Sequence, residues 1–315
     1  MLVELKPIFS VPITNARRYF FKRLAIHLAI KFPIFSSLIR LFNHRHSVLS
    51  VRDVEQIFYI CNCERESENI HFIRSIAANL HLENILDIGS NFGQFVSAIS
   101  SSFVKGICVD ANPAAVEFLG ANSVLDHFEK LNFAVIPNNL ITENAILKIP
   151  KGNTGKALIG TLDGEFESVS VPTAYVRTIS DRLPSSGRRL IKFDIEGLEP
   201  DLVKDYLSLE RKTDVIAFEV LTFEAKEKLN NAFKDQKEPY RFFTLRYSFL
   251  ANSGFMGENK LDLMRMFLSG NATLDVYAVD DLDMLPFVFM SLVFAIPKSL
   301  LVEGENFTLN EPLKL

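Results

Sequence analysis

Short apolar runs alternate with helix-like patterns through the middle of the chain. Apolar residues dominate positions 85–88 and 106–109, and further runs occupy residues 131–136, 190–195 and 215–218. Between these runs, apolar residues recur every three or four positions, as they do on one face of a helix. Strands that alternate with helices in this way predict a doubly wound α/β fold with a mostly parallel sheet.

The first of these runs carries Asp87 and breaks into a turn that contains two glycines. Glycine lets the backbone bend sharply and lets a ligand approach without a Cβ in the way. The second run ends in Asp110, about twenty residues later, where nucleotide-binding α/β folds hold a ribose. We therefore expect a nucleoside cofactor in contact with Asp87, Gly89, Ser90, Asn91, Gly93 and Asp110.

The glycine pattern separates two classes of nucleoside cofactor. A dinucleotide site needs Gly-x-Gly-x-x-Gly, so that the backbone can approach a pyrophosphate. This chain has one glycine too few, and Asn91 stands where a phosphate-approach glycine is expected. A cofactor without phosphates fits better, and S-adenosylmethionine is the obvious candidate. A nicotinamide-dependent oxidoreductase is disfavoured by the same pattern.

A dense set of charges begins within the run at residues 190–195 and continues after it, namely Lys192, Asp194, Glu196 and Glu199. On a strand, Lys192 and Asp194 point to the same side. Charges at such a position carry a desolvation cost unless they are paired or used in chemistry. They form either an ion pair followed by an ordinary acidic helix start, or a general base and a clamp for a substrate hydroxyl.

Residues 1–60 have a composition of their own and are expected to precede a main domain at residues 61–315. Nine Lys or Arg residues and no Asp or Glu lie between Lys6 and Arg52. The spacing predicts basic amphipathic helices on either side of Pro33. These helices either cap the main domain or contact an anionic membrane surface or a partner through residues 15–42.

Two later segments add β structure. Between Thr142 and Arg177, short apolar runs alternate with Gly, Asn, Thr and Ser. This texture predicts a β-rich ribbon inserted at the ligand edge of the sheet. The apolar run at residues 287–296 is about ten residues long, too short to span a membrane, so a buried strand is expected there.

Composition narrows the class of protein. The chain has 315 residues and a net charge of -4, which does not suggest a nucleic-acid binder. Three cysteines form no disulfide framework, so a reducing compartment is expected. The sequence contains no apolar run of about 18 residues and no signal-peptide layout. These features predict a cytoplasmic protein, with peripheral membrane contact left open, and they do not indicate an oligomeric state.

Two blocks together resemble the FkbM-type S-adenosylmethionine-dependent methyltransferases. Residues 86–93 look like the first motif of that family, and residues 110–113 are similar to its second region. Residues 192–199 resemble its Lys-Ile-Asp-Val-Glu-Gly-x-Glu hallmark. The resemblance covers roughly residues 70–220, so the first 60 residues and much of the chain after residue 225 lie outside it.

Single positions extend this resemblance and mark where the chain departs from it. Asn132 and Ala134 match the third strand of the family, and Glu219 fits a Glu after a later strand. Glu is commoner than Asp at the position of Asp110. Ser180 replaces the first acidic residue of a Thr-Leu-Asp-Asp block.

The resemblance implies a Rossmann-like class I methyltransferase fold and methyl transfer from S-adenosylmethionine. The acceptor is usually a hydroxyl oxygen on a sugar or another small-molecule or glycan acceptor. It adds Ala111, Asn112, Asn132 and Ala134 to the expected cofactor-binding residues. It makes Asp194, Glu196 and Lys192 the expected catalytic residues, with one carboxylate as general base.

Two alternatives stay open. No motif recommends a metal, although Asp194, Glu196 and Glu219 could together form an oxygen-ligand site. The chain could also be a methyltransferase-fold protein that has lost catalysis and acts as a binding or scaffolding module. Ser180 at a usually acidic position favours that second interpretation slightly. The intact acidic residues count against it, namely Asp87, Asp110, Asp194 and Glu196.

Overall fold

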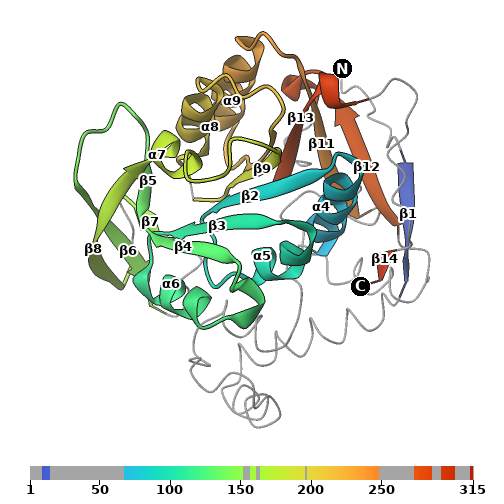
Figure 1. Ribbon diagram of the computed structural model, residues 1–315. Helices are drawn as coiled ribbons and strands as arrows, with labels where there is room; N and C mark the ends of the chain where they lie inside the picture. Colours follow the sequence, from blue (N-terminus) through green and yellow to red (C-terminus); the bar gives the residue numbers. More distant parts are fainter. Residues whose placement is uncertain are drawn as a thin grey trace.

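The computed structural model describes residues 9–14, 67–151, 157–160, 164–195, 197–247, 273–285, 292–301 and 313–314 (Figure 1). Its elements form a ten-stranded sheet, a second sheet of four strands, and helices on both faces of the first. The strands of the large sheet are β1 (Phe9–Thr14), β2 (Leu82–Ile88), β3 (Lys105–Asp110), β4 (Phe128–Asn132), β9 (Arg188–Phe193), β10 (Val215–Glu219), β11 (Tyr240–Tyr247), β12 (Thr273–Val279), β13 (Leu292–Pro297) and β14 (Leu313–Lys314).

The large sheet is wound outward from its middle in both directions. Its strand order is β14-β1-β12-β11-β13-β10-β9-β2-β3-β4. All neighbours from β10 through β9, β2 and β3 to β4 are parallel, while β13 runs antiparallel between β10 and β11. The chain leaves β2 toward β4 and then returns to β9 on the other side of β2. This order confirms the predicted doubly wound, mostly parallel sheet and places its switch point between β2 and β9.

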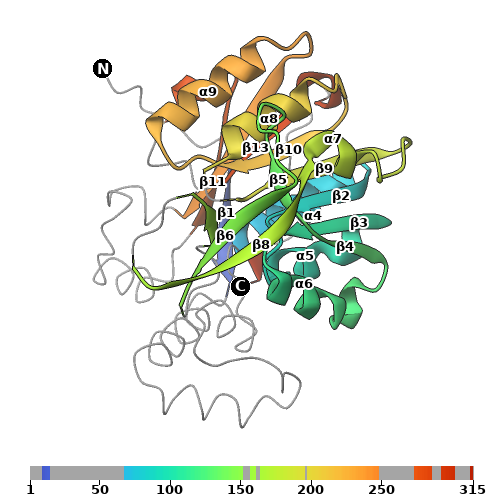
Figure 2. The same ribbon diagram turned by 90° about the vertical axis from the view of Figure 1, so that its left-hand side faces the viewer.

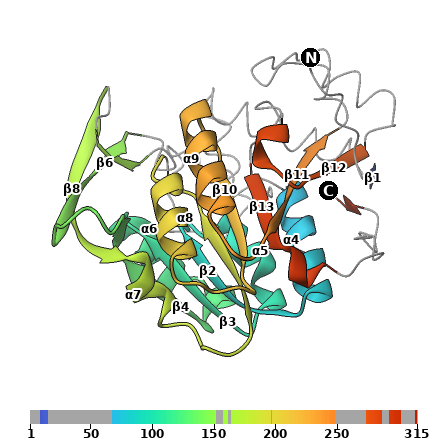
Figure 3. The same cartoon turned by 90° about the horizontal axis from the view of Figure 1, so that it is seen from above.

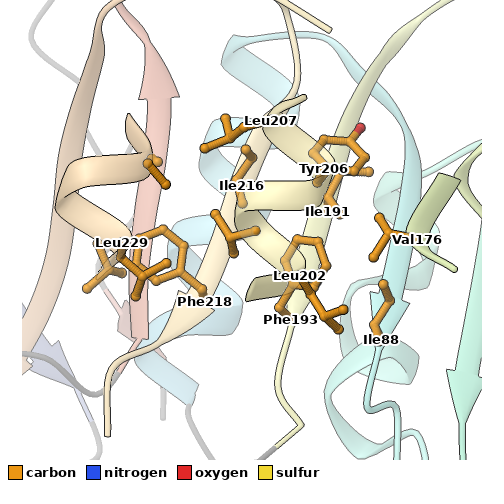
Figure 4. Close-up of a cluster of buried hydrophobic side chains, with 14 of the residues drawn as sticks. Ile88, Val176, Ile191, Phe193, Leu202, Tyr206, Leu207, Ile216, Phe218 and Leu229 are labelled. Carbon is orange, nitrogen blue, oxygen red and sulfur yellow. The ribbon is translucent and has the colours of Figure 1, made fainter. Parts of the chain in front are cut away.

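Helices cover the two faces of this sheet in separate layers (Figure 3). On one face, apolar side chains of α4, α5 and α6 pack on β2, β3 and β9. On the other face, α7, α8 and α9 cover the same strands together with β10, and Figure 4 shows side chains of that layer. The helices are α4 (Ser67–Asn79), α5 (Gln94–Ile99), α6 (Pro113–Gly120), α7 (Val176–Ser180), α8 (Glu199–Leu207) and α9 (Phe223–Lys234). The strands are buried on both faces, which explains their nearly continuous apolar runs.

The predicted β-rich insertion forms the second sheet, which lies beside β3 and β4 (Figures 1 and 2). Its strands are β5 (Ala134–Ile136), β6 (Asn144–Pro150), β7 (Leu158–Ile159) and β8 (Phe166–Tyr175), in the order β5-β8-β6-β7. β6 and β8 pair antiparallel over their lengths, and β5 pairs parallel with β8. A small apolar cluster of Ala134, Ala145, Leu147 and Val171 holds this sheet together.

The apolar run at residues 131–136 was expected to be one strand, and the structure divides it in two. β4 ends at Asn132 in the large sheet, and β5 begins at Ala134 in the second sheet. The Asn132 side-chain amide donates hydrogen bonds to the backbone carbonyls of Asp110 at 3.0 Å and Ala111 at 3.1 Å. These bonds tie the end of β4 to the end of β3, and the chain leaves the large sheet directly after them.

The two ends of the chain contribute strands to the far edge of the large sheet. β1 pairs antiparallel with β12, so residues 9–14 form a strand within the segment expected to be helical. The predicted amphipathic helices around Pro33 lie outside the described residues. β13 confirms part of the strand expected at residues 287–296, and its six residues are buried between β10 and β11. Within the described part of the chain, no helix is long and apolar enough to cross a membrane.

A close backbone contact joins the ends of β2 and β9. Gly89 has a φ of +86°, a value that glycine adopts without strain. A Cβ at this position would overlap the carbonyl oxygen of Asp194. The Asp194 amide also donates a hydrogen bond to the carbonyl of Ile88 at 3.0 Å. The two predicted motif blocks therefore meet backbone to backbone, and only glycine fits between them.

We expect Gly89→Ala to destabilise the protein by about 2–6 kcal/mol, because it adds backbone strain to an overlap with a fixed carbonyl. Urea unfolding followed by circular dichroism measures the change. Gly164→Ala is the matched control, since Gly164 has a φ of +96° but no atom lies within 4 Å of the place that a Cβ would occupy. The control should lose only about 1–2 kcal/mol, from strain alone. Equal losses in the two variants would contradict the close contact.

Candidate active site

A cavity of about 280 Å³ opens at the carboxyl ends of β2, β3, β9 and β10. Ligands of open α/β sheets bind at this edge, beside the switch point. Eight of the predicted site residues line the cavity: Gly89, Ser90, Asn91, Asp110, Ala111, Ala134, Lys192 and Asp194. The structure therefore brings together residues from both motif blocks, which lie about a hundred positions apart in the chain.

The glycine turn is held in place from both sides. The amides of Gly89 and Ser90 both donate to the carbonyl of Val109 on β3, at 2.9 and 3.1 Å. Asn91 follows with a positive φ of 47°. The helix after the turn, α5, is only six residues long, and Gly93 precedes it in the left-handed region. The turn thus presents a rigid strip of backbone to the cavity.

Asp110 fastens this turn to the start of α6. Its Oδ2 accepts a hydrogen bond from the Asn91 amide and its Oδ1 accepts one from the Asn112 amide, each at 2.7 Å. Desolvation raises the pKa of Asp110 to about 6, because the two amide bonds offset only part of the effect of burial. Each oxygen keeps a second lone pair, so the carboxylate can still accept hydrogen bonds from a ligand in the cavity.

Lys192 lies between two carboxylates at the centre of the site. Its Nζ is 2.7 Å from Asp194 Oδ2 and 3.5 Å from Asp87 Oδ1, and it lies 4.8 Å from the centre of the Phe95 ring. The side chains of Lys192 and Asp87 are 3% and 0% exposed, whereas that of Asp194 is 27% exposed. Asp194 is therefore the member of this cluster that a substrate can reach.

The loop after β9 is shaped by Glu199, which the sequence analysis did not include in the site. Glu199 is 1% exposed, and its carboxylate accepts hydrogen bonds from the amides of Ile195 at 3.0 Å and Gly197 at 2.8 Å. Burial raises the pKa of Glu199, and these amides counteract the rise. Glu199 thereby holds the segment that carries Glu196. Glu196 itself lies outside the described residues, so its predicted catalytic role stays a prediction.

Four predicted cofactor-binding residues do not line the cavity. Asn112 caps α6 by accepting a hydrogen bond from the Ala114 amide at 3.1 Å. The Asn132 side-chain amide donates to the backbone carbonyl of Asp110. A Cβ at Gly93 would meet the side chain of Leu119. Asp87 is buried beneath the turn. These residues support the turn and the strand ends rather than facing the cavity.

One wall of the cavity is apolar and comes from the second sheet and the segment before it. Its residues are Phe133, Ala134, Val135, Leu147, Ala157, Leu158 and Ile159. The insertion at residues 142–177 was expected at the ligand edge without any single residue of it being predicted, whereas Ala134 was predicted from the strand before it. Along β6, Ala145 and Leu147 are buried and Ile146 is exposed, an alternation that the uniformly apolar sequence of these three residues does not indicate.

Glu219 at the end of β10 lines the cavity as well, next to Leu221 and Leu198. The parallel pairing of Phe218 with Phe193 brings Glu219 opposite Asp194. A third carboxylate therefore borders the same space. In the described part of the chain, no group of three or more His, Cys, Asp or Glu side chains gathers closely enough to hold a metal ion.

No family model matches the chain, and no curated protein matches it. Solved structures similar to it include an O-methyltransferase from Bacillus cereus in complex with SAH, at 9% identity and a TM-score of 0.39, with 83% of this chain and 97% of that chain covered. A precorrin-6y C5,15-methyltransferase from Geobacter metallireducens has 13% identity and a TM-score of 0.36, with coverages of 72% and 87%. The plantazolicin methyltransferase BpumL in complex with SAH has 11% identity and a TM-score of 0.35, with coverages of 90% and 97%.

We expect Glu199→Ala to release the loop after β9, because two backbone amides lose their acceptor. The amides of Ile195 and Gly197 should exchange with solvent at least about tenfold faster, and the protein should lose about 2–3 kcal/mol of stability. Hydrogen exchange measured by mass spectrometry, with urea unfolding, tests both. Asp201→Ala is the control, since Asp201 is an exposed acid in the same helical turn and its loss affects only the helix dipole. Unchanged exchange at these amides in Glu199→Ala would show that Glu199 does not hold the loop.

Proposed function

We propose that this protein is an S-adenosylmethionine-dependent methyltransferase of the FkbM type, which transfers a methyl group to a hydroxyl of a sugar or another small-molecule or glycan acceptor. The charge around the cavity is the observation that carries the proposal. Three carboxylates line it, those of Asp110, Asp194 and Glu219, against one described cation, Lys192. A net negative cavity attracts a cationic sulfonium ligand and opposes the two negative charges of a pyrophosphate.

The residues present fit the nucleoside end of this cofactor. Asp110 has carboxylate lone pairs left for the two ribose hydroxyls, and the adjacent Gly89–Asn91 backbone leaves room for close approach. The apolar wall formed by Val135, Leu147 and Ile159 suits the faces of an adenine ring. Polar groups on one side and apolar groups on the other would orient the nucleoside across the cavity.

The other end of the cavity supplies groups for the methyl acceptor. When bound, S-adenosylmethionine supplies a methyl group on an activated sulfonium, so the protein mainly has to align the acceptor and remove a proton. Asp194 is accessible and can accept the proton of an acceptor hydroxyl as general base. Lys192 fixes the orientation of the Asp194 carboxylate through the ion pair at 2.7 Å. Leu198 and Leu221 offer apolar contact to the body of the acceptor.

The position of Ser180 speaks against the alternative that this protein is a methyltransferase-fold binding module without catalytic activity. That alternative was favoured by Ser180, which replaces a usually acidic residue. Ser180 is completely buried at the end of α7, where its hydroxyl donates to the carbonyl of Arg177 at 3.1 Å. It does not line the cavity, so the replacement leaves the charged groups of the site untouched.

We expect calorimetric titration of the full chain to show saturable binding of S-adenosylmethionine and none of NAD. Asp110→Ala should weaken the binding of S-adenosylmethionine at least about tenfold, since hydrogen bonds to a charged group contribute about 1.5–3 kcal/mol. Glu117→Ala removes an exposed carboxylate from α6 and should leave binding unchanged. Absence of binding at millimolar S-adenosylmethionine would overturn the proposed function.

Binding should also depend on pH through Asp110. The ionised carboxylate is the form that accepts ribose hydrogen bonds, and its pKa is raised to about 6. Affinity should therefore be full above pH 7 and fall as the pH drops through 6, to about tenfold weaker at pH 5. Titrations at several pH values test this, and Asp110→Asn should flatten the profile between pH 5 and 7. A wild-type profile that is flat over the same range would contradict the role assigned to Asp110.

A further inference from the structure

Asp87 is the most deeply buried charged group near the cavity, and its ion pair with Lys192 is a long one, at 3.5 Å. Its side chain is 0% exposed, and neither carboxylate oxygen has a hydrogen-bond partner within the described residues. Desolvation raises its pKa, and the positive charge of Lys192 opposes that rise. A buried polar group left without a hydrogen bond is rare and needs a physical reason.

The position of Asp87 argues against a direct contact with the cofactor. Asp87 does not line the cavity, and the glycine turn that follows it stands in between. The Ser90 hydroxyl donates to the backbone carbonyl of Asp87 at 2.7 Å, and its position near the Asp87 carboxylate also opposes the rise of the Asp87 pKa. The group that its carboxylate does face is the ammonium of Lys192.

Strand pairing places Lys192 between two acceptors. Asp87 and Lys192 are direct partners in the parallel pair of β2 and β9, and Asp194 lies two residues farther on the same side. The ammonium makes a short bond to Asp194 at 2.7 Å and stands 3.5 Å from Asp87. A small rotation about the terminal bonds of the lysine would reverse the two distances without any movement of the backbone.

We propose that Asp87 is a positioning residue that receives Lys192 when Asp194 takes a proton from the methyl acceptor. In this step the acceptor O–H bond would break and its proton would bind to an Asp194 oxygen. The acceptor oxygen would bond to the methyl carbon and displace the sulfur, which would leave as a neutral thioether with the electron pair of the broken carbon–sulfur bond. Lys192 keeps its own protons and exchanges its hydrogen bond to Asp194 for one to Asp87. The inference rests on the proposed function, because it uses Asp194 as the base.

Electrostatics give this exchange its direction. While Asp194 is ionised, it competes with Asp87 for the same ammonium and holds it in the shorter bond. Once Asp194 is protonated, its attraction falls to that of a neutral hydrogen bond, whereas Asp87 keeps a full charge in a poorly screened interior. The ammonium of Lys192 then makes its shorter hydrogen bond to Asp87, and these two buried groups together carry no net charge throughout the reaction. The longer distance from Lys192 to Asp87 in the resting state is what this arrangement requires.

Asp194→Asn imitates the protonated state of Asp194 and needs no acceptor. We expect a crystal structure of that variant to show Lys192 Nζ within about 3 Å of an Asp87 oxygen. We also expect the coupling between Asp87 and Lys192 to strengthen, measured by urea unfolding of Asp87→Asn, Lys192→Met and their double variant. The interaction between Asp87 and Lys192 from this double-mutant cycle, expressed as a ratio of equilibrium constants, should rise at least about tenfold in the Asp194→Asn background relative to wild type. Asp201→Asn, an exposed acid on α8, is the control background and should change nothing.

The outcomes separate this inference from the proposed function. If Lys192 stays beside residue 194 and the coupling is unchanged, the exchange is wrong. Asp194→Ser removes the same carboxylate and replaces the amide variant if that variant does not fold. Titration of Asp87→Asn with S-adenosylmethionine is an independent test, in which binding within threefold of wild type is expected and a loss as large as in Asp110→Ala would make Asp87 a cofactor ligand. Failure of wild type to bind S-adenosylmethionine would reject the proposed function while leaving the coupling result as it stands.

Discussion

The contact between Gly89 and the backbone of Asp194 is the constraint on which the site depends. It sets the spacing between the ends of β2 and β9, the two strands at the switch point of the sheet. The same pairing puts Asp87 opposite Lys192 and brings the glycine turn beside the charged block. Without a residue that lacks a side chain at position 89, the two halves of the site could not approach each other.

Charge is the second organising feature, and its cost explains much of the local structure. Carboxylates at the strand ends are partly desolvated, so each one has to be compensated. Asp110 and Glu199 are compensated by backbone amides, whereas Asp87 and Asp194 share one ammonium. Amides that belong to turns stabilise a carboxylate and fix a loop at the same time. A shared ammonium instead lies closer to one carboxylate than to the other, and under our proposal it would shift toward Asp87 once Asp194 takes up a proton.

The two sheets contribute different kinds of side chain to the site. The large sheet supplies the polar groups at its carboxyl edge, and the second sheet supplies an apolar wall through Leu147, Leu158 and Ile159. The break between β4 and β5 makes this possible, because it turns the chain out of the large sheet directly after Asn132. The insertion thus closes the cavity on one side instead of standing apart from it.

Local patterns in the sequence were sufficient for the doubly wound fold, the glycine turn and the carboxylates at the strand ends. Apolar periodicity and turn chemistry act over a few residues, so they can be recognised without knowledge of the rest of the chain. The tertiary structure alone decided which of these residues face the cavity. It placed Asn112, Asn132 and Asp87 outside the lining of the cavity. It also showed that Glu199 fixes the loop after β9 and that apolar residues of β6 and β7 line the cavity. Those assignments depend on packing between segments far apart in the chain, and no pattern within one segment encodes which neighbour will lie across from it.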